Sequence, residues 1–444
     1  MPKLNRKLIV LILAIVVSSC ALRATNQLPL TVVHSTASLS TSSTVQATTS
    51  QPTSTVLLEA HIVRRPEPAD PGKFHPELTS IPRFDLNVAD GFQVDLRSRD
   101  LTKIDMISSL IDLMYAVFDS KTQWPAADKM PAGFDWQQIL ELNKDPGLGV
   151  RVLHEQGITG KGVSIAIIDQ TLLVDHIEYK DRLRLYEEMD DVISEAPQAQ
   201  MHGPAVASIA VGKTVGVAPE ADLYYIATGF CGAKTFLEVD FACWARAVRR
   251  VVEINTSLPA DRKIRVLSLS WGWSTESTGY DEITAAVNEA KAAGIFVISS
   301  SLGHTDELYF QGLGREPLED PNRFEAYRPG LWWQKDYYAD PTGYKFGNPP
   351  QSLLLVPMDT RTTASPTGVE DYVFYRVGGW SWSIPYLAGI YALSAQANPE
   401  IKPQEFWKAA LKTGKTVQIQ HDGKRYDFGI ILDPQALIEE INTN

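Results

Sequence analysis

The chain has 444 residues, of which 44% are hydrophobic and 21% are charged, which is sufficient for one large folded domain. Its formal net charge of -12 creates a negative field that repels phosphate backbones at neutral pH. Nucleic acid is therefore not an expected partner.

The first segment, residues 1–19, has the pattern of a signal peptide: basic residues precede an apolar run over residues 8–17. That run is too short for a membrane-spanning helix. The sequence Val-Ser-Ser-Cys that ends at Cys20 resembles the bacterial lipobox, in which the cysteine is lipidated and becomes the new N-terminus. We therefore expect an exported lipoprotein, held at the cell membrane through Cys20 and facing outside the cytoplasm. Simple secretion with an incidental cysteine is the alternative.

Residues 20–55 are rich in Ser and Thr and bury too little apolar surface to order themselves, so they are predicted to be a tether. Residues 56–144 form an N-terminal region to which no chemistry is assigned, either a removable prosegment or an accessory segment. Within it, an amphipathic helix is expected over residues 106–119. Three aspartates at five-residue spacing, each followed by Leu or Met, predict a packed edge feature: Asp95, Asp100 and Asp105.

From residue 145 to residue 444 short apolar runs alternate with helical periods. Buried strands are expected over residues 163–169, 221–227, 264–270 and 294–300. Helices are expected over residues 203–210, 237–254 and 281–293. This alternation predicts an α/β fold with a mostly parallel central sheet flanked by helices, and functional residues at the carboxyl ends of its strands.

Three residues stand where such a fold places chemistry. Asp169 ends the first strand, His202 begins a helix of small residues, and Ser381 lies in "GGWSWSIPYLAGIYAL", a glycine turn that runs into a helix with Pro385 in its first turn. A serine needs a histidine to take its proton, and that histidine needs a carboxylate to orient it. Each residue alone is more simply a cap or a core residue, but the three together indicate nucleophilic catalysis.

These segments resemble those of the subtilisin-like serine proteases (peptidase family S8), whose chain order is also Asp, His, Ser. "VSIAIID" resembles the aspartate strand, "HGPAVASIAVG" the histidine helix, and "GWSWSIPYLAGIYAL" the serine helix. The resemblance covers about residues 145–399 and implies a subtilisin-like three-layer fold and a serine endopeptidase. It implies that Asp169 orients the base, that His202 is the general base and acid, and that Ser381 is the nucleophile.

The resemblance further implies that Ser270, Trp271 and Gly272, in "VLSLSWG", line the cleft and pair with an extended polypeptide substrate. The family's oxyanion asparagine is replaced here by the run Leu302-Gly303-His304, so the second oxyanion donor beside the Ser381 N–H is expected to be His304 or a rearranged loop. Loss of one such donor costs on the order of 100- to 1000-fold in turnover in subtilisin. That loss keeps open a second interpretation, a pseudoprotease that serves as a surface binding module; a purely adhesive or structural lipoprotein is a third.

No cofactor is assigned, although calcium is common in the family, and a monomer is expected. Cys231 and Cys243 form an even pair in an exported chain, and they are either bridged or two buried thiols. The aromatic span over residues 314–350 is long for a connection and is expected to pack, as a wall of the cleft or as a surface insertion. The sequence lacks the residue spacing that a phosphate-binding loop or a zinc site requires. It also lacks the motif and the chain order of an α/β-hydrolase, so these three interpretations are set aside.

Overall fold

The computed structural model describes residues 60–70, 77–88, 90–189, 192, 196–229, 231, 238–341 and 353–443. The predicted signal peptide, Cys20 and the Ser/Thr tether lie outside the described residues. None of the helices in the described ranges is long and apolar enough to cross a membrane.

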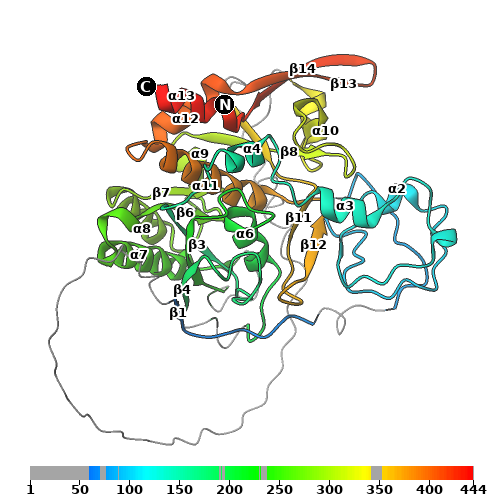
Figure 1. Cartoon of the computed structure of the whole chain (residues 1–444), viewed down its shortest axis with the longest axis horizontal. Coiled ribbons are helices and arrows are strands. Elements are labelled where there is room, and N and C mark those ends of the chain that lie inside the picture. The colour runs from blue at the N-terminus through cyan, green and yellow to red at the C-terminus, as the bar shows by residue number, and fades with distance from the viewer. Residues whose placement is uncertain are drawn as a thin grey trace, which may run out of the picture.

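A six-stranded sheet forms the centre of the molecule, in the order β1-β4-β5-β3-β6-β7, and every neighbouring pair is parallel (Figure 1). Its strands are β1 (His61–Ile62), β3 (Ser164–Asp169), β4 (Leu183–Glu188), β5 (Asp222–Ala227), β6 (Ile264–Leu269) and β7 (Phe296–Ser299). Four of these strands were predicted as continuous apolar runs, and all four predictions are confirmed to within two residues at each end. The predicted mostly parallel α/β sheet is therefore confirmed.

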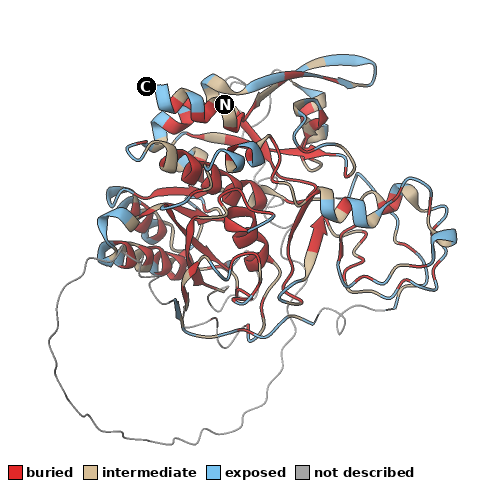
Figure 2. Cartoon of the chain, viewed as in Figure 1, coloured by how far each residue is buried: buried red, intermediate tan, exposed pale blue. Residues whose placement is uncertain are grey.

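Helices cover both faces of this sheet, which gives three layers. Along β3, Ile165 and Ile167 belong to one core while Ala166 and Ile168 belong to the other, because side chains alternate across a strand. The first core contains α6 (His202–Val211) and α11 (Trp380–Ala397), and the second contains α7 (Phe241–Ser257) and α8 (Tyr280–Ala292). Figure 2 shows that α6 and α11 are buried along nearly their whole length.

Two smaller sheets adjoin this core. One has the order β13-β14-β10-β8-β9 and the other the order β11-β12-β2. Their strands are β2 (Phe118–Asp119), β8 (Tyr309–Arg315), β9 (Tyr327–Pro329), β10 (Leu353–Pro357), β11 (Arg361–Ala364), β12 (Tyr372–Tyr375), β13 (Lys415–His421) and β14 (Lys424–Ile431). The remaining helices are α2 (Leu110–Leu113), α3 (Trp136–Leu142), α4 (Val150–Glu155), α9 (Leu302–Thr305), α10 (Gln334–Ala339), α12 (Pro403–Thr413) and α13 (Pro434–Thr443), with 3₁₀ turns at Ala127–Lys129, Ala260–Arg262 and Phe324–Ala326.

The prediction of a helix over residues 106–119 is wrong for most of that range. Only Leu110–Leu113 is helical, and Phe118–Asp119 is a strand paired with β12. The N–H of Val117 donates to the carbonyl of Val94, and the carbonyl of Val117 accepts from the N–H of Leu96, so Val117 pairs with a neighbouring extended segment and not with a helical turn. The expected packing of the aspartate repeat is confirmed: Leu96, Leu101 and Met106, which follow the three aspartates, are fully buried.

Candidate active site

Asp169 is the last residue of β3 and is only 3% exposed. Its Oδ1 accepts a hydrogen bond from the backbone N–H of Gln170 at 2.7 Å. Its backbone carbonyl accepts from Thr228, the residue after β5. The carboxylate is therefore held at the carboxyl edge of the central sheet, where the sequence placed it.

His202 is the first residue of α6 and is 6% exposed. Its Nδ1 lies 2.6 Å from Oδ1 of Asp169. Gly203 makes this approach possible, because a Cβ there would lie 2.5 Å from the carbonyl oxygen of Gln170. The hydrogen bond to the carboxylate fixes the proton on Nδ1 and leaves Nε2 as the basic nitrogen of the ring.

Ser381 is the second residue of α11, and its side chain is half-buried. The turn before it needs glycine, since Gly379 has φ +66° and ψ 174°. The sequence placed Pro385 in the first turn of this helix, and this is wrong: the helix begins at Trp380, so Pro385 is its sixth residue. The carbonyl of Ser381, four residues earlier, consequently has no helical N–H donor. The Oγ of Ser270 donates to it instead, at 3.1 Å.

The hydrogen bond from Ser270 to Ser381 joins the end of β6 to the start of α11. Ser270 follows β6, whose Leu269 pairs with Ile168 of β3, so the start of α11 lies at the sheet edge that carries Asp169. The ring of Trp382, next to Ser381, is 5.1 Å from the His202 ring. Among the described residues, no hydrogen bond joins Nε2 of His202 to Oγ of Ser381. Such bonds are often long without substrate and shorten in the substrate complex.

The predicted oxyanion donor forms no hydrogen bond with Asp169, His202 or Ser381 in the described part of the chain. His304 lies on the short helix α9 and is exposed, and within the described ranges its side chain makes no hydrogen bond. Its backbone N–H donates to Ser301. The backbone N–H of Ser381 is in the first turn of α11, where amides have no helical acceptor.

The predicted substrate segment, Ser270 to Gly272, follows directly after β6. Besides the bond from Ser270, the N–H of Ser300 donates to the carbonyl of Trp271, and a Cβ on Gly272 would lie 2.9 Å from Cβ of Ser300. The indole of Trp271 packs against Trp244, with ring centroids 5.0 Å apart. Ser270 thus supports Ser381 directly, a role that the sequence did not predict.

The sequence predicted that the aromatic span over residues 314–350 would pack, but it did not predict the partners of these side chains. Trp333 and Tyr337 are buried, which confirms the packing of the described part of that span. The ring of Trp332 is 5.5 Å from that of Trp380, and the Trp380 Nε1 donates to the buried side chain of Gln311 on β8. The aromatic contacts therefore reach the residue that precedes Ser381.

Cys231 and Cys243 are bridged, which settles the two alternatives in favour of the disulfide. The bridge ties the segment after β5 to α7. No group of three His, Cys, Asp or Glu side chains suited to a metal ion occurs in the described part of the chain.

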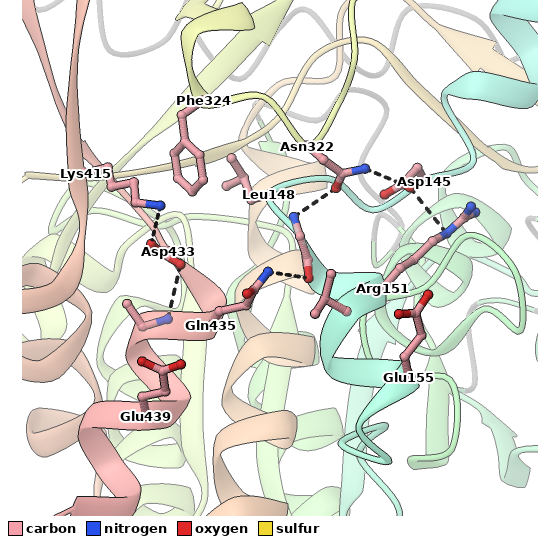
Figure 3. A pocket seen from close by; sticks show the side chains of 13 residues that line it. Asp145, Leu148, Arg151, Glu155, Asn322, Phe324, Lys415, Asp433, Gln435 and Glu439 are labelled. Atoms are coloured by element: carbon pink, nitrogen blue, oxygen red, sulfur yellow. Dashed lines mark hydrogen bonds and ion pairs between the residues drawn. The ribbon is translucent and has the colours of Figure 1, made fainter.

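A pocket of about 590 Å³ lies elsewhere, between α4, α13 and the segment around Asn322 (Figure 3). Its charges are largely paired, since Arg151 lies 3.5 Å from Asp145 and Lys415 lies 2.9 Å from Asp433. None of Asp169, His202 and Ser381 lines it. It is therefore separate from the cluster of Asp169, His202 and Ser381.

Comparison with known proteins gives concordant results. Residues 160–328 match the model of the subtilase family (peptidase S8), a range that includes Asp169 and His202. The serine protease AprX of Bacillus subtilis (strain 168) is 25% identical over 313 residues, which are 63% of this chain and 67% of that protein.

Solved structures with partial likeness include the prenylagaramide maturation protease PagA, with a TM-score of 0.44 and 15% identity over 66% of this chain and 98% of that one. A cold adapted subtilisin-like serine proteinase has a TM-score of 0.36 and 16% identity over 58% of this chain and 83% of that one. Residues 160–328 of this chain thus resemble the subtilase family, and the similar Bacillus protein is a serine protease.

Proposed function

We propose that the chain hydrolyses peptide bonds through an acyl-enzyme formed on Ser381, with His202 as the base and Asp169 as its orienting carboxylate. The 2.6 Å bond between Asp169 and Nδ1 of His202, both buried at the sheet edge where α11 begins, carries this proposal. A buried carboxylate stabilises the imidazolium that forms during the reaction. Before the reaction it holds the ring proton on Nδ1, which leaves Nε2 unprotonated and able to act as the base.

The reaction then has two halves. Oγ of Ser381 attacks the scissile carbonyl while Nε2 of His202 takes its proton, and the backbone N–H of Ser381 donates to the developing oxyanion. The imidazolium gives that proton to the leaving amine as the peptide bond breaks, which leaves an ester on Ser381. Water, deprotonated by His202, hydrolyses the ester and restores the serine hydroxyl. We keep His304, or a rearranged loop, as the proposed second oxyanion donor when substrate is bound.

A fluorophosphonate probe tests the nucleophile, because it forms a stable adduct only with an activated serine. We expect intact mass to show a single adduct on the chain from residue 56 onward and none on Ser381→Ala. By analogy with other triads, Asp169→Asn should lower the labelling rate on the order of 10⁴-fold. A folded wild-type chain that takes no label would instead favour the pseudoprotease interpretation.

His304→Ala tests the second donor. If His304 supplies it, peptidase turnover falls on the order of 100-fold or more, the loss seen for one oxyanion donor. Unchanged turnover would clear the histidine of this role and leave the rearranged loop. Thr305→Ala, a change to the next residue on α9, serves as the matched control.

We further propose that the enzyme is exported and anchored in the membrane through a lipid on Cys20. The basic and apolar N-terminus with a cysteine at its cleavage point supports this location. Metabolic labelling with a clickable fatty acid should mark the wild-type chain in its bacterial host and leave Cys20→Ala unmarked. An unlabelled wild-type chain in the culture medium would point to simple secretion.

A further inference from the structure

Asp359 follows β10 and directs a buried carboxylate at the turn that precedes Ser381. The residue is 4% exposed. Its Oδ1 accepts a hydrogen bond from the N–H of Gly378 at 3.0 Å, and its Oδ2 accepts one from the N–H of Leu331 at 2.8 Å. Both carboxylate oxygens are thus used, each by a backbone amide of a different segment.

The turn at Gly378 packs directly against the segment that carries this carboxylate. A Cβ on Gly378 would lie 2.3 Å from the carbonyl oxygen of Met358 and 2.5 Å from Cδ1 of Trp382. A buried amide in so tight a turn needs an acceptor, since an unpaired buried N–H costs about 1–3 kcal/mol. Asp359 supplies this acceptor to the N–H of Gly378, which lies three residues before Ser381. Ser270 separately donates to the carbonyl of Ser381.

The second bond of the carboxylate orders the aromatic segment. Leu331 precedes Trp332, whose ring lies 5.5 Å from that of Trp380 and whose Nε1 lies 3.2 Å from Sδ of Met358. One side chain therefore fixes both the turn into the nucleophile helix and the indole that packs on the residue before Ser381.

The chemistry of the two donors requires a carboxylate. An asparagine of the same shape would place an NH₂ group against one of the two backbone N–H groups, because an amide has only one acceptor oxygen. The structure keeps an ionisable group here although burial disfavours its charge.

We infer that Asp359 is a positioning residue for the proteolytic reaction, which holds the Gly378–Ser381 turn and the Trp332 segment in the geometry that the attack by Ser381 requires. The inference rests on the proposed role of Ser381 as nucleophile. A displacement of a reacting group by about 1 Å can cost on the order of 100-fold in rate, so a loosened turn is expected to slow acylation more than it weakens substrate binding.

The test compares Asp359→Asn with a matched control, Asp433→Asn. Asp433 is also a buried carboxylate that accepts a backbone N–H, that of Ala436, but it lies on the wall of the separate pocket. We expect Asp359→Asn to lower the fluorophosphonate labelling rate and kcat by about 10-fold or more, with KM for a peptide changed by less than about 3-fold. Hydrogen exchange at the amides of Gly378 and Leu331 should accelerate. The control should show neither change.

A folded Asp359→Asn variant that labels at the wild-type rate would overturn the inference while the proposed function stood. A wild-type chain that takes no label would reject both. If circular dichroism shows that the asparagine variant does not fold, Asp359→Ser, which keeps one small acceptor, gives the same comparison. An equal fall in labelling and in substrate affinity, with unchanged exchange at Gly378, would also count against positioning.

Discussion

At the scale of single residues, the position of Ser381, the proposed nucleophile, depends on Pro385, whose effect on the helix the sequence predicts only in part. Pro385 deprives the Ser381 carbonyl of its helical donor, and Ser270 replaces that donor from the end of β6. The bond locks the helix start to the sheet edge that bears Asp169. Because Pro385 removes a helical hydrogen bond, the Ser381 carbonyl accepts from Ser270, and this bond sets the position of Ser381.

Ser270→Ala should consequently do more than remove a hydroxyl. We expect a loss of about 0.5–1.5 kcal/mol in unfolding free energy, since a part-buried carbonyl loses its donor, and a fall of roughly 10-fold in labelling rate as the helix start shifts. Thermal unfolding and fluorophosphonate kinetics measure the two effects. Ser394→Ala removes a similar hydroxyl-to-carbonyl bond later in α11 and should leave labelling unchanged; equal rates in both variants would contradict the role of Ser270.

His176 makes stability depend on pH. Burial lowers the pKa of this histidine below its ordinary value of 6.5, and its neutral ring is fully used, with Nδ1 accepting from the Glu178 N–H and Nε2 donating to the Asp371 carbonyl. The unfolded chain therefore takes up a proton near pH 6.5 while the folded chain does not. Stability is complete above that pH and declines below it.

We expect His176→Gln to reduce the loss of unfolding free energy between pH 6.5 and pH 5 by at most about 1.4 kcal/mol per pH unit, the limit for one proton. Denaturant unfolding at several pH values measures this slope. His421→Gln, at a half-exposed histidine, is the control. Identical slopes in the wild type and in His176→Gln would show that His176 does not contribute.

Some residues near Ser381 could be placed from the sequence and others could not, for a physical reason. Asp169 and His202 end a strand and begin a helix, and the carboxyl edge of a parallel sheet fixes where such residues lie. The surroundings of Asp359 depend instead on contacts with distant segments, the turn at Gly378 and the chain at Leu331. No local pattern marks Asp359, since its two partners are 28 and 19 residues away.

At the scale of elements, burial on both faces made the central strands easy to predict, because they appear as continuous apolar runs. The helix over residues 106–119 failed for the opposite reason. Its apolar residues satisfy a helical period, but Phe118 pairs with Phe374 of β12, some 250 residues later. Periodicity carries no information about such a distant partner strand.

The Cys231–Cys243 bridge is an element-scale restraint with a measurable effect. It closes a loop between residues 12 apart, a length for which loop closure in the unfolded chain is worth about 3 kcal/mol. We expect the double variant Cys231→Ser, Cys243→Ser to unfold at a lower temperature and to be insensitive to reductant. Labelling of Ser381 below that temperature should persist, because the sheet itself holds Asp169. A melting temperature equal to that of the oxidised wild type would contradict this prediction.

At the scale of the whole molecule, the N-terminal region is built into the catalytic fold. β1 is the edge strand of the central sheet, and β2 pairs with β12, which leads to Ser381 (Figure 1). Arg64, near β1, forms an ion pair with Glu188 at 2.7 Å and donates to the carbonyls of Ala196 and Pro197. These contacts favour an accessory segment that stays attached over a removable prosegment.

Removal of residues 56–144 should therefore cost the enzyme its fold. Phe374 packs on Phe118 with ring centroids 5.2 Å apart, and the side chain of Glu188 is only 1% exposed, so a chain that begins at residue 145 exposes an apolar strand and leaves a buried carboxylate without its cation. We expect this chain to lack a cooperative melting transition and to resist fluorophosphonate labelling, while a chain that begins at residue 56 melts and labels like the full protein. Intact mass of the enzyme isolated from the cells that express it should show residues 56–144 still attached. A shortened chain that melts and labels normally, or a mature enzyme cleaved near residue 144, would instead identify the region as a prosegment, with β1 and β2 as contacts that maturation dissolves.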